Sequence, residues 1–104
     1  MTDKKYHVQI TERCFITLRK HMEFIAKVNI NAAKKFKNEF MEIAQGLETF
    51  PERNIAVRLS VAPNIIYHRA LIGKFHALLY EIQGSNVYVD LVIDIRQNIK
   101  VSLL

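Results

Sequence analysis

The chain has 104 residues, of which half are hydrophobic and 24% are charged, and its formal net charge is +5. This length predicts a single domain over residues 1–104, and the mixture is typical of a globular protein rather than a disordered one. No apolar run is long enough to cross a bilayer, the first residues lack a signal-peptide core, and a single cysteine excludes an internal disulfide. We therefore expect a cytoplasmic protein without a membrane partner, and the positive charge favours nucleic acid or an acidic protein as its partner.

The first half of the chain predicts one strand and two helices. Apolar residues alternate between Tyr6 and Ile10, as they do in a strand, and Thr11 then follows as a helix N-cap. Asn31 is the expected cap of the second helix, and Gly46 and Pro51 are expected to end it. The apolar positions of the two helices recur every three or four residues: Phe15, Leu18, Met22 and Ile25, then Ala33, Phe36, Phe40, Ile43 and Leu47. Two such helices joined by a short polar link predict an antiparallel helical hairpin.

The second half predicts strands. Segments rich in β-branched and aromatic residues, bounded by turn formers, cover residues 55–60, 65–71, 75–82 and 86–95. Gly84 can supply the positive φ of a tight turn between the last two segments. We therefore expect an α+β fold, in which an N-terminal strand and a helical hairpin precede a three- to four-stranded antiparallel sheet with the helices on one face.

If Gln83 pairs with Asn86, the side chains of the last two strands alternate between two defined faces of the hairpin. One face is apolar and is expected to lie under the helices; its pairs are Ile82 with Val87, Tyr80 with Val89, Leu78 with Leu91 and His76 with Ile93. The other face mixes apolar groups with charges; its pairs are Glu81 with Tyr88, Leu79 with Asp90, Ala77 with Val92 and Phe75 with Asp94, and Arg96 follows. Because no element remains to cover this mixed face, we expect it to be exposed and to bind a partner. A shift of one residue in register would exchange the two faces.

The sequence predicts neither a metal site nor a cofactor, and no stand-alone catalytic motif is present. Asp90 and Asp94 would lie roughly 13 Å apart along one strand, too far to work as a catalytic pair, and are interpreted as solubilising charges. The four histidines, His7, His21, His68 and His76, lack metal-binding spacing. His76 is expected to be a core or rim histidine, and Cys14 a small apolar group rather than a nucleophile.

Two longer segments resemble the RelE/ParE superfamily, the toxins of bacterial toxin–antitoxin pairs. Residues 29–51, NINAAKKFKNEFMEIAQGLETFP, resemble the second helix of the ParE branch, with Ile30 in place of the usual proline. Residues 68–98, HRALIGKFHALLYEIQGSNVYVDLVIDIRQN, resemble the family's ending. The positions that match its pattern without a gap are Arg69, Leu71, Tyr80, Gly84, Val92 and Arg96. The resemblance implies the toxin of a type II (plasmid stabilisation) pair that inhibits growth until a cognate antitoxin neutralises it. Antitoxins of this family usually wrap an amphipathic, often acidic segment around the toxin, by groove binding or strand addition.

Departures from the family pattern bear on the mechanism. Members that cut messenger RNA on the ribosome carry an arginine where this chain has Ala77, and Asp94 replaces the family's histidine. The tail after residue 94 also lacks the tyrosine or histidine that these members usually add there. Of their catalytic set only Arg96 is clearly kept, so the resemblance favours the ParE branch, whose members inhibit DNA gyrase by binding.

Three functions follow as hypotheses. The first is a gyrase-binding toxin with no active site of its own, whose contacts come from the mixed face and the tail. Its expected contact residues are Arg69, Phe75, Leu79, Tyr88, Val92, Asp94, Arg96 and Lys100, with Leu103 and Leu104. The second is a ribosome-dependent mRNA endoribonuclease that uses Lys74, His76 and Arg96. The third is a degenerate, non-toxic member that binds only its antitoxin.

Overall fold

The computed structural model describes residues 5–97 and 101–103 and has the expected α+β composition. In chain order the elements are β1 (His7–Ile10), α1 (Glu12–Ala26), α2 (Ile30–Gly46), the short 3-10 helix η1 (Pro51–Arg53), β2 (Ala56–Leu59), β3 (Ala62–Ile72), β4 (His76–Gln83), β5 (Asn86–Asp94) and β6 (Val101–Leu103). The order of strand, two helices and then strands confirms the predicted fold class.

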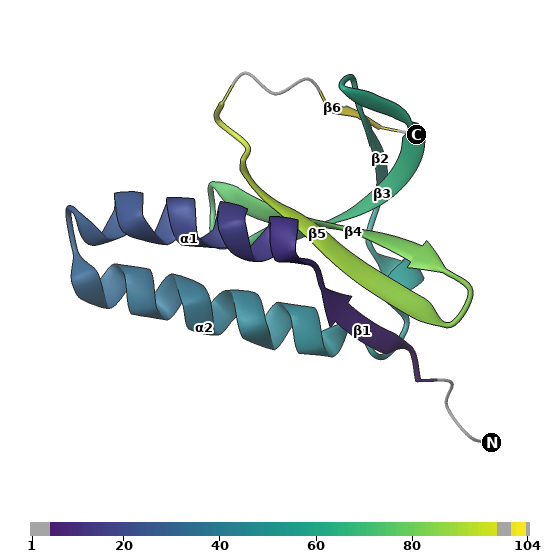
Figure 1. The fold of residues 1–104 in the computed structure, drawn as a ribbon, viewed down its shortest axis with the longest axis horizontal. Helices are drawn as coiled ribbons and strands as arrows, with labels where there is room; N and C mark the ends of the chain where they lie inside the picture. The colour runs from purple at the N-terminus through teal and green to yellow at the C-terminus, as the bar shows by residue number, and fades with distance from the viewer. Residues whose placement is uncertain (1–4, 98–100, 104) are drawn as a thin grey trace.

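The sheet has more strands than the sequence predicted, and it is mixed rather than antiparallel. Its order is β1-β5-β4-β3-β2-β6 (Figure 1). The strands from β2 to β5 pair antiparallel with their neighbours, as expected. The first strand pairs in parallel with β5, and β6 adds an antiparallel strand beside β2. The parallel pair is possible because the helical hairpin and three strands separate its members in the chain, which leaves ample length for a crossover.

Both helices begin at side-chain caps. The backbone amide of Cys14 donates to Thr11 Oγ1 at 3.1 Å, which confirms Thr11 as the cap of α1. The predicted cap of α2 was wrong by two residues: Asn29, not Asn31, caps it. Asn29 Oδ1 accepts from the amides of Asn31 at 2.9 Å and Ala32 at 3.1 Å. Ile30 is therefore the first helical residue, a position where proline also fits well.

A β-bulge at Asp90 divides the β4–β5 hairpin. From the turn outward the pairs run as predicted, from Gln83 with Asn86 to Tyr80 with Val89. Beyond that point Leu79 pairs with Leu91 and His76 with Asp94, so Asp90 is an extra, unpaired residue. The extra residue exchanges the two faces of the sheet on which the following side chains of β5 lie. Val92 and Asp94 therefore lie on the helix side and Leu91 and Ile93 on the other, and the predicted faces of these four residues were wrong.

The sheet has a buried cluster on each side. The cluster under the helices includes Cys14, Leu18, Phe36, Phe40, Ala44, Leu47, Ala70, Ile72, Leu78, Tyr80, Val87, Val89 and Val92. The cluster on the opposite side comprises Val57, Leu59, Tyr67, Ala77, Leu79 and Ile93. Figure 1 shows why it exists: β2 and β3 curve away from the helices. Their apolar residues cover Ala77 and Leu79, which are both fully buried. The expectation that nothing covers this face was therefore wrong.

Candidate functional site

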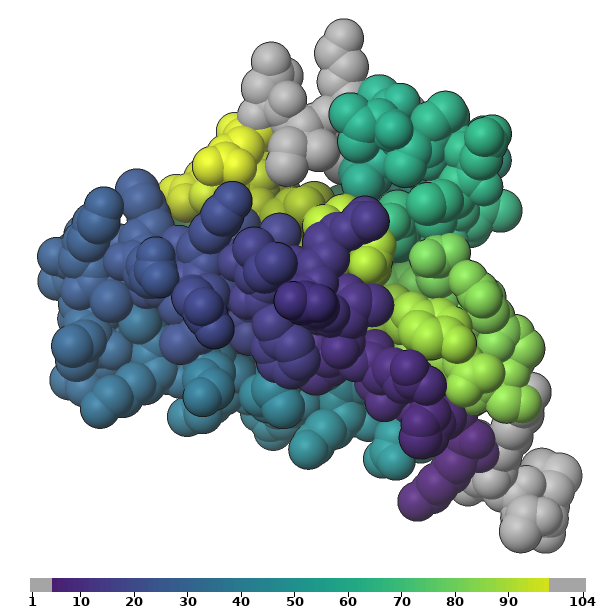
Figure 2. Space-filling model, in the orientation of Figure 1, coloured from purple at the N-terminus to yellow at the C-terminus, as the bar shows by residue number. Residues whose placement is uncertain are grey.

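A cavity of about 580 Å³ opens where the turn between α1 and α2 meets the start of β4 and the end of β5. We call it the hairpin-end cavity. Its polar lining consists of Lys20, His21, Asn29, His76, Asp94, Arg96 and Gln97, and its apolar lining of Phe24, Ile25, Val28 and Ala32. In Figure 2 the last residues of β5 and those that follow it, in yellow, lie against the helical hairpin, in blue. The cavity thus brings α1, α2 and the sheet together.

Asp94 and Arg96 form the strongest polar contact of the cavity. The guanidinium donates from Nε to Asp94 Oδ1 at 3.0 Å and from Nη2 to Oδ2 at 2.8 Å, and the Arg96 amide also donates to Oδ1. These hydrogen bonds hold the pKa of Asp94 down at about 2, although burial of the carboxylate acts in the opposite direction. Arg96 itself is about half exposed and lies 4.2 Å from the centre of the Phe75 ring. The carboxylate is ionised at neutral pH, and it offsets much of the cation's charge.

Two imidazoles meet on the inner wall. The ring of His76 makes edge-to-face contacts with Phe36 at 4.7 Å and with His21 at 5.1 Å between centroids. Burial lowers the pKa of His76, and the charges of His21 and Arg96 lower it further, against an opposing effect of Asp94. The ring is therefore neutral at pH 7. His76 Nε2 lies 3.9 Å from Asp94 Oδ2, too far for a hydrogen bond, and the contact is an ion pair only when the ring is protonated.

The structure gathers some of the sequence-predicted site residues here and disperses the others. Phe75, His76, Asp94 and Arg96 come together at the hairpin-end cavity. Lys74 is exposed in the β3–β4 turn and is not part of the lining.

The remaining predicted contacts lie elsewhere. Arg69 and Tyr88 are partly buried on the side of the sheet that faces away from the helices. Leu79 and Val92, expected on an exposed face, are instead buried in the two clusters. Lys100, Leu104 and the side chain of Leu103 lie outside the described residues.

Sequence reasoning missed His21 as a partner of His76. A signal was available, because His21 continues the stripe of α1 that faces the sheet, three positions after Leu18 and four before Ile25. The strand residue that it would meet could not be read from the chain, since that depends on the register beyond the bulge.

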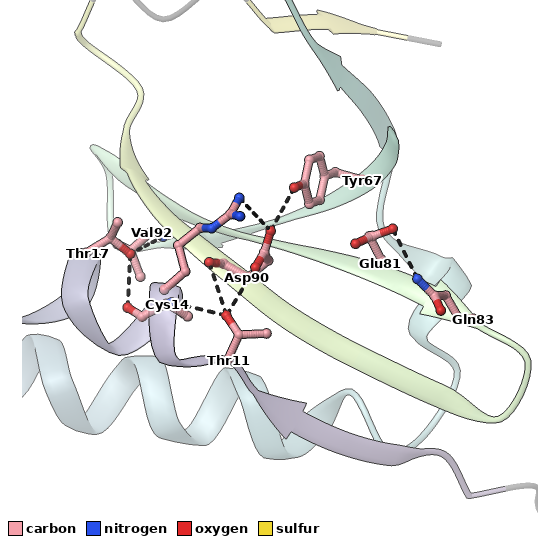
Figure 3. A network of polar contacts seen from close by, with 9 residues as sticks. Thr11, Cys14, Thr17, Tyr67, Glu81, Gln83, Asp90 and Val92 are labelled. Carbon is pink, nitrogen blue, oxygen red and sulfur yellow. Dashed lines mark hydrogen bonds and ion pairs between the residues drawn. The ribbon is translucent and has the colours of Figure 1, made fainter. Parts of the chain in front are cut away.

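The bulge residue Asp90 forms a second polar cluster, shown in Figure 3. Tyr67 donates its hydroxyl to Asp90 Oδ2 at 2.7 Å, Thr11 donates to Oδ1 at 3.1 Å, and Arg13 Nη1 lies 3.6 Å from Oδ2. Burial and the hydrogen bond to Asp90 raise the pKa of Tyr67. Asp90 is therefore not the solubilising surface charge that was expected. It joins β5 to β3 and to the start of α1.

Cys14 lies beside this cluster and is fully buried. Burial, with a smaller effect of the Asp90 charge, raises the pKa of its thiol to about 12. The thiol is thus protonated at neutral pH, which agrees with the prediction of an apolar group rather than a nucleophile.

No protein-family model and no curated protein matches the chain. Among the described residues, no group of three or more His, Cys, Asp and Glu side chains is arranged to hold a metal ion. None of the described helices is both long and apolar enough to span a membrane.

Proposed function

We propose that the chain is the toxin of a type II toxin–antitoxin pair of the RelE/ParE kind, that it works in the cytoplasm by binding DNA gyrase, and that a cognate antitoxin silences it. The observation that carries the binding mechanism is the state of the retained cation. Arg96 donates hydrogen bonds from Nε and Nη2 to the Asp94 carboxylate. Ala77, at the position of the family's arginine, is fully buried.

That arrangement is poorly suited to cutting RNA. Attack of a 2′-hydroxyl on a phosphodiester needs proton transfer and a cation against the charge that develops on the phosphate. The guanidinium of Arg96 already faces a carboxylate, and a charged side chain at residue 77 would have to lie inside the buried cluster below β2 and β3.

The same surface suits protein binding. Around the hairpin-end cavity, Phe24 is 69% exposed and Val28 is 89% exposed, and the half-exposed guanidinium stacks on Phe75 nearby. Exposed aromatic and aliphatic groups beside an arginine are the usual composition of an energetic centre in a protein interface.

The test is a gyrase assay with the purified protein, which follows supercoiling and trapped cleaved DNA. We expect dose-dependent inhibition. Replacing Arg96 with alanine should weaken inhibition about tenfold or more while the circular dichroism spectrum is kept, because the Arg96 side chain is about half exposed and lies outside both buried clusters. Lys74→Ala is the matched control, since Lys74 is an exposed cation outside the cavity.

Two results would contradict the proposal. A folded Arg96→Ala variant with full potency would show that the hairpin-end cavity is not part of the target-binding surface. If a large molar excess of the protein does not inhibit gyrase, gyrase is not the target. If expression of the protein then also leaves growth unaffected, the protein is not toxic.

A ribosome-dependent mRNA endoribonuclease is the second candidate, favoured by the pair of imidazoles. His21 and the neutral His76 line one cavity with Lys20 and Arg96, so a base and cations lie close together there. Mapping cleaved messages after induction separates this activity from gyrase inhibition. If the candidate is right, His21→Asn and His76→Asn should each abolish the cleavages but leave the protein folded.

A further inference from the structure

The positive charge of the chain is concentrated in residues 19–37, which cover the end of α1, the turn and the start of α2. This segment contains one acid, Glu23, and six cations: Arg19, Lys20, Lys27, Lys34, Lys35 and Lys37. Its net charge of +5 equals that of the whole chain, because the chain's 15 cations and 10 acids leave nine of each for the other 85 residues. All six cations are exposed, and among the described residues none of them takes part in an ion pair.

The charged segment forms one end of the molecule. Figure 1 shows the turn between α1 and α2 at the end of the longest axis, where both helices extend past the sheet. In Figure 2 the same end, in blue, projects from the rest of the molecule. This end can therefore meet a broad surface without obstruction by the sheet.

Large apolar side chains are exposed around this turn. Val28, within the turn, is 89% exposed, Phe24 near the end of α1 is 69% exposed, and Ile30 at the start of α2 is 63% exposed. We call residues 24–30 the hairpin tip. Phe24 and Val28 also line the hairpin-end cavity, but most of their surface remains in water. The tip thus combines exposed apolar groups with the cations that precede and follow them in the two helices.

The surface of an anionic membrane fits both features. Exposed apolar side chains can enter the boundary between headgroups and acyl chains, while the lysines beside them keep their ammonium groups among the headgroups. The negative potential of anionic lipids attracts clustered lysine and arginine residues. Nucleic acid would also attract the cations, but its phosphates would leave the three apolar side chains without a partner. The apolar tip therefore favours lipid.

We propose that the hairpin tip binds the surface of an anionic membrane, with Phe24, Val28 and Ile30 at the acyl boundary and the cations of residues 19–37 at the lipid headgroups. The expectation of a protein without a membrane partner rested on the absence of a spanning segment, and a surface contact needs none. The inference does not rest on the proposed function, and gyrase inhibition is measured separately.

The first measurement is flotation of the purified protein with vesicles. One set contains phosphatidylcholine alone, and the other contains equal parts of phosphatidylcholine and phosphatidylglycerol. We expect binding at least about tenfold tighter to the anionic vesicles, and this difference should shrink at high salt because the charges are exposed and screened.

A fluorescent side chain reports whether the tip enters the lipid. The chain has no tryptophan, so Phe24→Trp introduces a single one at the tip. Its emission should shift to shorter wavelength on addition of anionic vesicles, and lipids brominated on their acyl chains should quench it. Phe50→Trp is the matched control, since Phe50 is also 69% exposed but lies just before η1, beyond the other end of α2. Its emission should not change.

Two further variants separate the apolar and the charged contributions. Ile30→Glu should weaken binding to anionic vesicles about tenfold or more, and it should fold because an acidic residue in the first turn of a helix is favourable. Val61→Glu is its control, with the same change of charge at a side chain that is 89% exposed in the β2–β3 turn.

The double variant Lys34→Gln, Lys35→Gln should also weaken this binding about tenfold or more. Lys5→Gln, Lys74→Gln removes the same charge at exposed positions outside the segment and should bind as the parent does.

Several outcomes would overturn the inference. They include no binding to either kind of vesicle, equal binding to both, and an emission change as large in Phe50→Trp as in Phe24→Trp. A folded Ile30→Glu variant that binds as tightly as Val61→Glu would overturn it too. Tight binding of a short DNA duplex together with no binding of anionic vesicles would assign the cations to nucleic acid instead.

Discussion

Arg96 holds a nearly buried carboxylate at the open end of the β4–β5 hairpin. Asp94 has a pKa of about 2 in the folded protein, against an ordinary value of 3.8. Because the pKa is depressed, the pair stabilises the fold above about pH 4, and this contribution is lost as the pH falls from about 4 to 2.

Arg96→Gln should therefore be less stable than the parent at pH 6, and the difference should close as the pH approaches 2. Without the guanidinium, Asp94 keeps a higher pKa and gains less on ionisation. Urea denaturation midpoints at pH 6, 4 and 2 measure the effect. A difference that is the same at all three values would show that the variant acts through packing and not through the carboxylate.

Ala77 provides a second test at the residue scale. An arginine at this position should not create a ribonuclease, because the side chain would enter the buried cluster formed with Leu79 and Ile93. We expect Ala77→Arg to lower the free energy of unfolding by about 3 kcal/mol or more, from overpacking and an unpaired buried charge. Leu71→Arg is the control, since Leu71 pairs with Ala77 across the strands and is about half exposed. An Ala77→Arg protein as stable as this control would contradict the packing described above.

At the scale of the elements, the bulge at Asp90 decides which side chains of β5 face the helices. Its carboxylate binds a hydroxyl from β3 and the cap residue of α1. Asp90→Ala should lose about 1–3 kcal/mol of stability, because Tyr67 loses its acceptor and Thr11 keeps only the long contact with the main-chain oxygen of residue 90, at 3.5 Å. Asp90→Asn keeps one acceptor oxygen and should lose less. Thermal and urea unfolding of both variants measure this, and an alanine variant no less stable than the asparagine one would be inconsistent with the contacts in Figure 3.

The bulge also explains where reading the sequence succeeded and where it failed. Local signals located Thr11 as a cap, the hairpin turn at Gly84 and the pairs from Gln83 to Tyr80, because each depends on residues close together in the chain. The Asp90 carboxylate at the bulge binds Thr11 and Tyr67, which are distant from it in sequence, so its neighbours in the chain did not signal the bulge. Strict strand alternation therefore predicted the wrong faces beyond residue 90. The cavity formed by His76, Asp94 and His21 could not be predicted for the same reason.

For the whole molecule, one sheet supports two buried clusters because its far strands curve. Leu79 lies between β3 and β5 in the cluster away from the helices and is fully buried. Had the predicted exposed face been right, shortening this side chain would have affected binding alone. The curvature makes it a structural residue.

Leu79→Ala should therefore destabilise the protein by about 2–5 kcal/mol, the usual cost of a cavity in a close-packed core. Leu71→Ala, on the neighbouring strand and about half exposed, should cost less than about 1 kcal/mol. Urea denaturation of the two variants gives the comparison. Equal, small losses would mean that β2 and β3 do not cover Leu79 in solution.

The parallel pairing of β1 with β5 has a consequence for how the chain is made. His7 pairs with Asn86, so β1 acquires its neighbour only after all the residues between these two strands have been made. Until then α1 and α2 can form their hairpin but have no sheet to cover, and their apolar stripes stay open to other proteins. Contacts so distant in sequence also slow folding. The nascent helical hairpin is thus exposed to chaperones, and to any partner that recognises it, until β5 has been made.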